Sequence, residues 1–106
     1  MTADVPTMEM VRFRLAGSPT PQDVLDAAAE LESFLKGRAG FLRRELLVPD
    51  DTAGEWVDLV LWQSADDAFA AAQELESSGK MTECGFFQMI DPNSIVMQHL
   101  PAHAMG

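Results

Sequence analysis

The stretch 57-VDLVLWQSADDAFAAA-72 changes its hydrophobic period in the middle. Its first part is a run of aliphatic and aromatic residues typical of a strand, whereas its last part has the spacing and composition of a helix. Ser64 stands between them and can cap the free amides of a helix start, and Asp67 makes this a near relative of a capping box. The stretch therefore predicts a strand over residues 56–62 that passes directly into a helix over 65–77.

Outward from this junction, the same signals predict the remaining elements. Further strands are expected over residues 8–15, 41–48 and 94–100. Thr20 followed by Pro21 begins a first helix, which ends at the KGRAG stretch with Gly37 as a candidate cap residue. The short polar turn PDDTAGE between the second and third strands favours an antiparallel hairpin. The segment 80–90 is expected to form a short helix or a turn.

The order strand, helix, strand, strand, helix, strand is the split βαβ pattern, βαββαβ. It predicts an α+β fold in which an antiparallel sheet carries both helices on one face. The chain must cross the sheet before it adds the last strand, and a helix can do so while satisfying its own backbone hydrogen bonds. A length of 106 residues suits a single domain over 1–106, with its core at about 7–101.

Composition and charge narrow the range of partners. With 47% apolar residues the chain is expected to fold, and a formal net charge of −10 disfavours nucleic acids and anionic membranes as partners. Cys84 is the single cysteine, so no internal disulfide is expected, which suits a reducing compartment. The stretch MTADVPTMEM lacks the features of a signal peptide, and no apolar run reaches the ~20 residues that span a bilayer. We expect a cytoplasmic protein.

Strand alternation predicts which residues the helices cover. The face with Val11 and Phe13 on the first strand, and the face with Leu59 on the third, are purely apolar and are expected to receive the helices. The opposite face would carry Met10, Arg12, Arg14, Trp56, Asp58, Val60 and Trp62. Each indole could bury on the order of 200 Å², worth several kcal/mol at ~25 cal/mol per Å².

Such a face is expected to pair with its copy in a homodimer. The predicted interface residues are Met10, Arg12, Arg14, Trp56 and Asp58. In this arrangement Arg12 or Arg14 would form ion pairs with Asp58 or Glu45 across the interface.

The order of elements, and LVLWQSADDAFAAA in particular, resembles the antibiotic-biosynthesis-monooxygenase-like (ABM-like) domains of the dimeric α/β-barrel superfamily. In that family the third strand often ends in a Trp, followed by a polar residue, a Ser cap and a helix rich in Ala and Phe. The resemblance covers roughly residues 7–101 and implies a ferredoxin-like fold and a homodimer joined through the exposed sheet faces.

The resemblance also implies several chemistries: cofactor-free oxidation of aromatic polyketides, haem degradation and quinol oxidation. The haem-degrading branch surrounds haem with an Asn on the first strand, a Trp in the second helix and a His in the short third helix, and this chain has none of them at those positions. The polyketide-oxidising branch uses Trp, Asn and Tyr; here Trp62 matches the strand-end position, the single Asn93 lies in a predicted turn, and there is no Tyr.

Candidate functional residues are few. His99, near the end of the last strand, is the one plausible base, and the alternative is a partly buried histidine that donates to a backbone carbonyl. Cys84 could be a reactive thiol, but the sequence around it favours an inert, semi-buried side chain. His99 and His103 lie on either side of Pro101 and cannot form a helical metal-binding pair, so no metal is expected. No cofactor is expected either.

Two functions remain open. The first is a non-catalytic homodimer that binds a small apolar or aromatic ligand, or another partner. The alternative is a cofactor-independent monooxygenase acting on a small aromatic or quinol-like substrate. The expected ligand-pocket residues, between sheet and helices, are Phe13, Leu59, Trp62, Phe86 and Met97.

Overall fold

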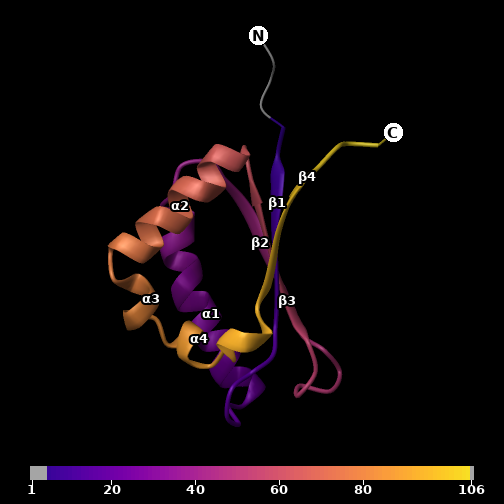
Figure 1. Ribbon diagram of the computed structural model, residues 1–106, viewed down its shortest axis with the longest axis vertical. Helices are drawn as coiled ribbons and strands as arrows, with labels where there is room; N and C mark the ends of the chain where they lie inside the picture. The colour runs from indigo at the N-terminus through magenta and orange to yellow at the C-terminus, as the bar shows by residue number, and fades with distance from the viewer. Residues whose placement is uncertain (1–4, 106) are drawn as a thin grey trace.

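The chain folds in the βαββαβ order that its sequence predicts (Figure 1). The computed structural model describes residues 5–105, so the two ends of the predicted domain, 1–4 and 106, lie outside the described residues. The strands are β1 (Thr7–Phe13), β2 (Phe41–Leu47), β3 (Trp56–Trp62) and β4 (Val96–Pro101). The helices are α1 (Pro21–Lys36), α2 (Ala65–Ser77) and two single turns, α3 (Lys80–Glu83) and α4 (Gly85–Gln88), followed by a 3₁₀ turn at Pro92–Ser94.

Both long helices begin at the caps expected from the sequence. Thr20 and Asp23 form a reciprocal capping box at α1: Thr20 Oγ1 accepts from the Asp23 amide at 3.1 Å, and Asp23 Oδ2 accepts from the Thr20 amide at 3.2 Å. At α2, Ser64 Oγ accepts from the Asp67 amide at 3.2 Å. These bonds satisfy amides that have no partner within the helix, and they fix the abrupt change from strand β3 to helix α2.

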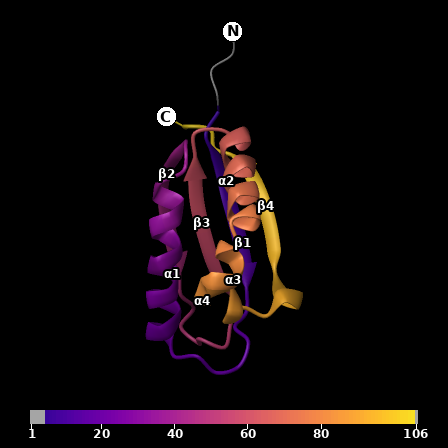
Figure 2. The same ribbon diagram turned by 90° about the vertical axis from the view of Figure 1, so that its left-hand side faces the viewer.

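The described strands form an antiparallel sheet in the order β2-β3-β1-β4, so β2 and β4 are the edges. All helices lie on one side of this sheet, with α1 towards β2 and α2 towards β4 (Figures 1 and 2). Within residues 5–105, the other side of the sheet carries no helix. The predicted architecture, an antiparallel sheet covered on one face, is confirmed.

The predicted orientation of β3 is wrong. Phe13 pairs with Trp56 in the register and Thr7 with Trp62, so both indoles share the helix-covered face with Phe13. Trp56 is 0% and Trp62 1% exposed in the single chain, and the Phe13 and Trp56 rings stack with centroids 6.2 Å apart. Val57, Leu59 and Leu61 therefore face the uncovered side. Both faces of β3 are largely apolar, and burial beneath the helices removes the two largest side chains from water completely.

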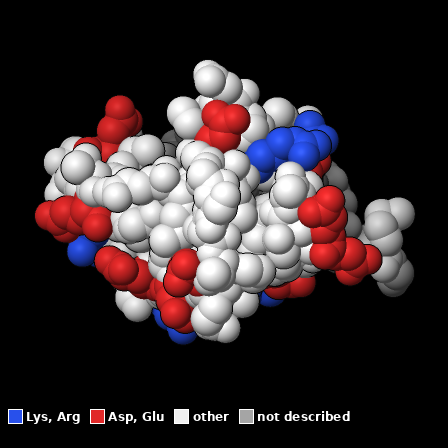
Figure 3. Space-filling model, turned by 90° about the horizontal axis from the view of Figure 1, so that it is seen from below, with Lys and Arg blue, Asp and Glu red and all other residues white. Residues whose placement is uncertain are grey.

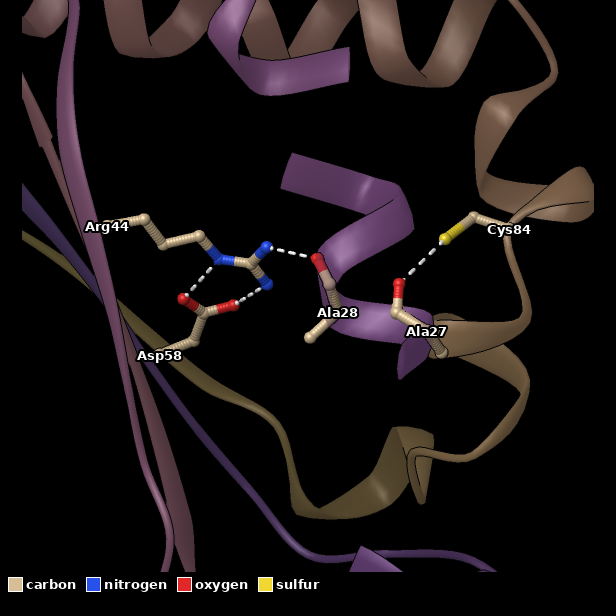
Figure 4. Close-up of polar contacts among 5 residues, drawn as sticks. All are labelled: Ala27, Ala28, Arg44, Asp58 and Cys84. Atoms are coloured by element: carbon tan, nitrogen blue, oxygen red, sulfur yellow. Dashed lines mark hydrogen bonds and ion pairs between the residues drawn. The ribbon is translucent and has the colours of Figure 1, made fainter. Parts of the chain in front are cut away.

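Asp58 lies under the helices as well, not at a subunit interface. It pairs within its own chain with Arg44 of β2, through Nε at 2.9 Å and Nη2 at 2.6 Å, and Arg44 Nη1 donates to the Ala28 carbonyl of α1 at 2.7 Å (Figure 4). The expected partners of Asp58 are engaged elsewhere: Arg12 lies 3.7 Å from Glu55, and Arg14 donates to a backbone carbonyl.

The surface carries the acidic excess that the composition predicts. Seen from below, Asp and Glu side chains are spread around a central area of uncharged residues, with fewer Lys and Arg side chains (Figure 3). Among the described residues, no helix is long and apolar enough to cross a membrane.

Candidate functional site

A cavity of about 180 Å³ lies between the covered face of the sheet and the helices. Apolar side chains make up nearly all of its wall: Val11, Phe13, Leu31, Leu35, Val60, Trp62, Ala68, Ala71, Ala72, Leu75, Met81, Phe86, Phe87, Ile90, Ile95 and Met97. The exposed side chains of Met81, Ile95 and Met97 place its rim between α3 and the start of β4. Within the described part of the chain, the ionisable residues of the wall are Glu9 and Asp58.

Among the described residues, Glu9 is the ionisable residue of the cavity wall that has no arginine partner. It lies on β1 opposite His99 of the edge strand β4, and Oε2 of Glu9 is 3.0 Å from Nε2 of His99. Their side chains are only 14% and 22% exposed. Burial raises the pKa of Glu9 above its ordinary value, the contact with His99 opposes this shift, and the Asp58 charge adds to it. Glu9 is therefore a carboxylate that gains a proton more readily than an exposed one.

The Trp62 indole supplies a hydrogen-bond donor beside this carboxylate. Glu9 and Thr7 pair in the register with Val60 and Trp62, so Glu9 and Trp62 are diagonal neighbours on one face. Trp62 Nε1 is buried and has no hydrogen-bond partner among residues 5–105, and the nearness of this N–H to Glu9 lowers the pKa of the carboxylate. An unpaired buried donor costs about 1–3 kcal/mol, which a ligand oxygen or a water could offset.

The indole N–H of Trp56, in contrast, has a hydrogen-bond partner. Trp56 Nε1 donates to the Thr52 carbonyl at 3.0 Å. The two tryptophans thus differ: Trp56 Nε1 is bonded to a turn carbonyl, whereas Trp62 lines the cavity and its Nε1 has no hydrogen-bond partner among the described residues.

The predicted site residues are only partly brought together. Phe13, Trp62, Phe86 and Met97 line the cavity; that they bind a ligand stays a prediction. Leu59 was expected there and lies on the opposite face of the sheet, because its register partner is Met10. Met10 and Arg12 lie on the uncovered face and Arg14 just beyond the end of β1, so their interface role also stays a prediction, whereas Trp56 is wholly buried within its own chain.

His99 reaches the cavity through Glu9 and is not itself part of the cavity wall. Its ring contacts the Glu9 carboxylate in place of the expected backbone carbonyl, and its role as a base stays a prediction. Sequence reasoning missed Glu9 altogether. The signal was present: Glu9 is in phase with Val11 and Phe13, so the alternation that placed those two under the helices also placed a carboxylate there.

Cys84 is buried, and its Sγ lies 3.7 Å from the Ala27 carbonyl of α1 (Figure 4). Its surroundings are those of a packed side chain. In the described part of the chain, no group of three or more His, Cys, Asp or Glu residues is placed to hold a metal ion.

No protein-family model matches this sequence, and neither does any curated protein. Solved structures do match it. A mutant of SnoaB, a cofactor-independent oxygenase from Streptomyces nogalater, is 18% identical with a TM-score of 0.74, covering 94% of this chain and 95% of that chain.

Two further structures are similar over most of their length. A candidate antibiotic biosynthesis monooxygenase from Bordetella bronchiseptica is 12% identical, with a TM-score of 0.73 and coverage of 95% of this chain and all (100%) of that one. A conserved protein of unknown function from Bacteroides thetaiotaomicron, described as a possible oxidoreductase, is 14% identical, with a TM-score of 0.68 and coverage of 94% and 100%. This chain has the fold of an antibiotic-biosynthesis-monooxygenase-like domain.

Proposed function

We propose that this protein binds a small hydroxyaromatic molecule, a single ring with one hydroxyl group, in the cavity between sheet and helices. The observation that carries the proposal is the pairing of an acceptor, the Glu9 carboxylate, with a free donor, the Trp62 indole N–H, in an otherwise apolar wall. A phenolic hydroxyl can donate to the first and accept from the second. Its ring then contacts aromatic and aliphatic side chains.

The cavity volume sets the size of the ligand. Small-molecule sites usually run from ~300 Å³ upwards, whereas an apolar cavity of ~150 Å³ takes up a benzene ring. At about 180 Å³ this cavity therefore suits one ring rather than a fused polycyclic system.

The test compares phenol with toluene, which has a methyl group in place of the hydroxyl. A hydrogen bond to a charged acceptor is worth ~1.5–3 kcal/mol, so phenol is expected to bind roughly ten- to a hundredfold more tightly. In a titration followed by ¹⁵N–¹H NMR, the indole signal of Trp62 should shift and that of Trp56 should not, because Trp56 Nε1 is already bonded. Glu9→Leu should abolish the preference for phenol.

A cavity-filling variant supplies the control. Ala71→Leu places a larger side chain in the wall and should prevent binding if the protein remains folded, which the dispersed NMR spectrum would show. Binding of phenol that moves neither indole signal, or that survives in a folded Ala71→Leu protein, would contradict the proposal.

A second candidate function is oxidation of the bound ring by O2 without a cofactor. It is favoured by a buried carboxylate in contact with a histidine at the cavity, and by the structural likeness to SnoaB, itself a cofactor-independent oxygenase. Glu9 would take one hydroxyl proton of a quinol, and the resulting anion would give two electrons to O2; with the second hydroxyl proton and the proton held by Glu9, the products are the quinone and hydrogen peroxide. General base catalysis contributes about 10²–10⁴-fold, so Glu9→Gln should reduce quinol-dependent oxygen uptake by that factor. If the unmodified protein takes up no oxygen with a quinol, the oxidation hypothesis is wrong.

We further propose that the protein is a homodimer joined through the uncovered face of the sheet. The two tryptophans are buried beneath the helices and do not reach this face, but other apolar side chains do. The uncovered face carries many apolar side chains, among the polar ones of Arg12, Arg43, Glu45 and Gln98: Met8, Met10, Leu47, Val57, Leu59, Leu61, Val96 and Leu100. Large contiguous apolar patches on soluble proteins generally mark interaction sites, and a second copy presents a surface of the same chemistry.

The four strands of six or seven residues cover a flat area of about 400 Å² before the relief of the side chains is counted, which places this face at the small end against the ~800 Å² of accessible surface that each partner buries in a standard interface. A dimer held by this face alone is therefore expected to dissociate on dilution. Leu59→Glu places a charge at its centre and should give monomers in sedimentation velocity runs, whereas Gln73→Glu adds the same charge to α2 and should leave the dimer intact. Wild-type protein that is monomeric at every concentration would refute the dimer.

A further inference from the structure

We propose that Glu9 and His99 form a two-residue proton relay, in which Glu9 takes the proton of a ligand hydroxyl inside the cavity and His99 receives it at the open edge of the sheet. The inference rests on the proposed binding of a hydroxyaromatic ligand and adds the route by which that ligand loses its proton. It gives His99 a role that needs no direct contact with the ligand.

The position of the two residues in the sheet provides this route. Glu9 lies on the central strand β1 and belongs to the cavity wall, whereas its register partner His99 lies on the edge strand β4 outside that wall. Their side chains meet at 3.0 Å, a distance over which a proton can transfer directly. The Phe69 ring of α2 covers the imidazole, with centroids 4.9 Å apart, and leaves it 22% exposed on the solvent side.

The groups around Glu9 explain why the proton must move on. Asp58 of β3 is a second carboxylate in the same wall, although Arg44 of β2 neutralises it. The helices over Glu9 present apolar side chains to the cavity, among them Ala68 and Leu75. Two adjacent anions, phenolate and carboxylate, would be costly in this setting. A positive imidazolium beside Glu9 offsets that cost, and its partial exposure allows water to solvate it.

The steps conserve protons. The ligand O–H bond breaks and its proton passes to a Glu9 carboxylate oxygen. The carboxyl group turns so that this proton lies on Oε2, and it passes from there to Nε2 of His99, which must be the neutral tautomer with its proton on Nδ1. The result is a bound phenolate, a Glu9 carboxylate and a His99 imidazolium, with the net charge unchanged. The Trp62 N–H can donate to the phenolate oxygen.

The experiment uses para-nitrophenol, whose phenolate absorbs at a longer wavelength than the neutral phenol. Absorbance is recorded with excess protein at the pKa of the free phenol, which lies above the ordinary pKa of an imidazole, so that the neutral tautomer is present. The bound probe should absorb as phenolate with the wild-type protein. In Glu9→Gln and in His99→Gln the ratio of bound phenolate to bound phenol should fall by at least about tenfold, which is one unit in the pKa of the ligand. His103→Gln is the matched control and should behave as wild type.

Two further measurements separate the relay from a structural role. The NMR shift of the Trp62 indole should show that every variant still binds the probe. In His99→Ala, added imidazole should restore the phenolate absorbance, which a purely structural loss would not allow. If His99→Gln ionises the bound probe as the wild type does, the relay is wrong while ligand binding stands. If the wild-type protein does not bind the probe at all, both proposals fail.

Discussion

The buried pair between Arg44 and Asp58 allows a sharp prediction of stability. Arg44→Met keeps a long apolar side chain in place but removes the guanidinium. It leaves the Asp58 carboxylate and the Ala28 carbonyl without their partner beneath α1. The two ionic side chains are only 2% and 8% exposed, so water cannot take over these bonds without opening the fold.

The expected loss is large relative to total stability. Removing one partner of a buried, hydrogen-bonded ion pair costs about 3–5 kcal/mol, against about 5–15 kcal/mol for an entire small domain. At ~4 °C or more per kcal/mol, Arg44→Met should lower the melting temperature by about 12 °C or more. The double variant Arg44→Met/Asp58→Leu removes both charges and should recover most of this loss, because the desolvation cost disappears with the pair.

Urea unfolding followed by tryptophan fluorescence measures these differences. Arg43→Met is the matched control, since Arg43 is adjacent in sequence but half-exposed on the other face, where its pair with Glu45 is worth ~1 kcal/mol at most. Arg44→Lys keeps a charge without the planar two-bond geometry and should lose less than Arg44→Met. The reasoning is refuted if Arg44→Met costs no more than Arg43→Met, or if the double variant is no more stable than Arg44→Met alone.

Three further predictions concern stability. Gly40 has a φ of +82°, and a Cβ there would collide with the Asp67 side chain, whereas Gly17 has a φ of +69° in open space. Gly40→Ala and Gly17→Ala should both lower the free energy of unfolding by about 1–3 kcal/mol through the backbone, and Gly40→Ala should lose more because of the clash. Equal losses in urea titrations would contradict the clash. Burial raises the pKa of Glu9 above 4.5, so just above that pH the folded state binds more protons than the unfolded state. The stability of the wild-type protein should therefore fall relative to that of Glu9→Gln as the pH rises from about 4 to 7. A constant difference in stability between the two proteins would show that the pKa of Glu9 is not perturbed. Thr20→Ala removes the cap of α1 and should cost ~1 kcal/mol in thermal unfolding, and no loss would mean that the cap is dispensable.

The fold could be predicted because its signals are local. Thr20 and Ser64 mark helix starts through their own hydrogen bonds, and the change of period at Ser64 needs no knowledge of distant residues. The face of β3 could not be predicted in the same way. Trp56 and Leu59 lie on opposite faces of one strand and both are apolar, so the choice depends on the register with β1 and on the volume beneath the helices, and both are properties of the folded chain.

The candidate site likewise combines a feature that the local sequence indicates with one that depends on the folded chain. Glu9 could have been found from its phase with Phe13 on β1, but its contact with His99 joins residues 90 positions apart and follows from the neighbouring places of β1 and β4 in the sheet. Because β4 is an edge strand, the imidazole lies at the boundary between cavity and solvent; a histidine at the matching place on β3 would be enclosed. The order of the strands therefore determines which residue can carry a proton out of the cavity, and moving the Glu9 partner to β3 would remove that route without changing the cavity wall's composition.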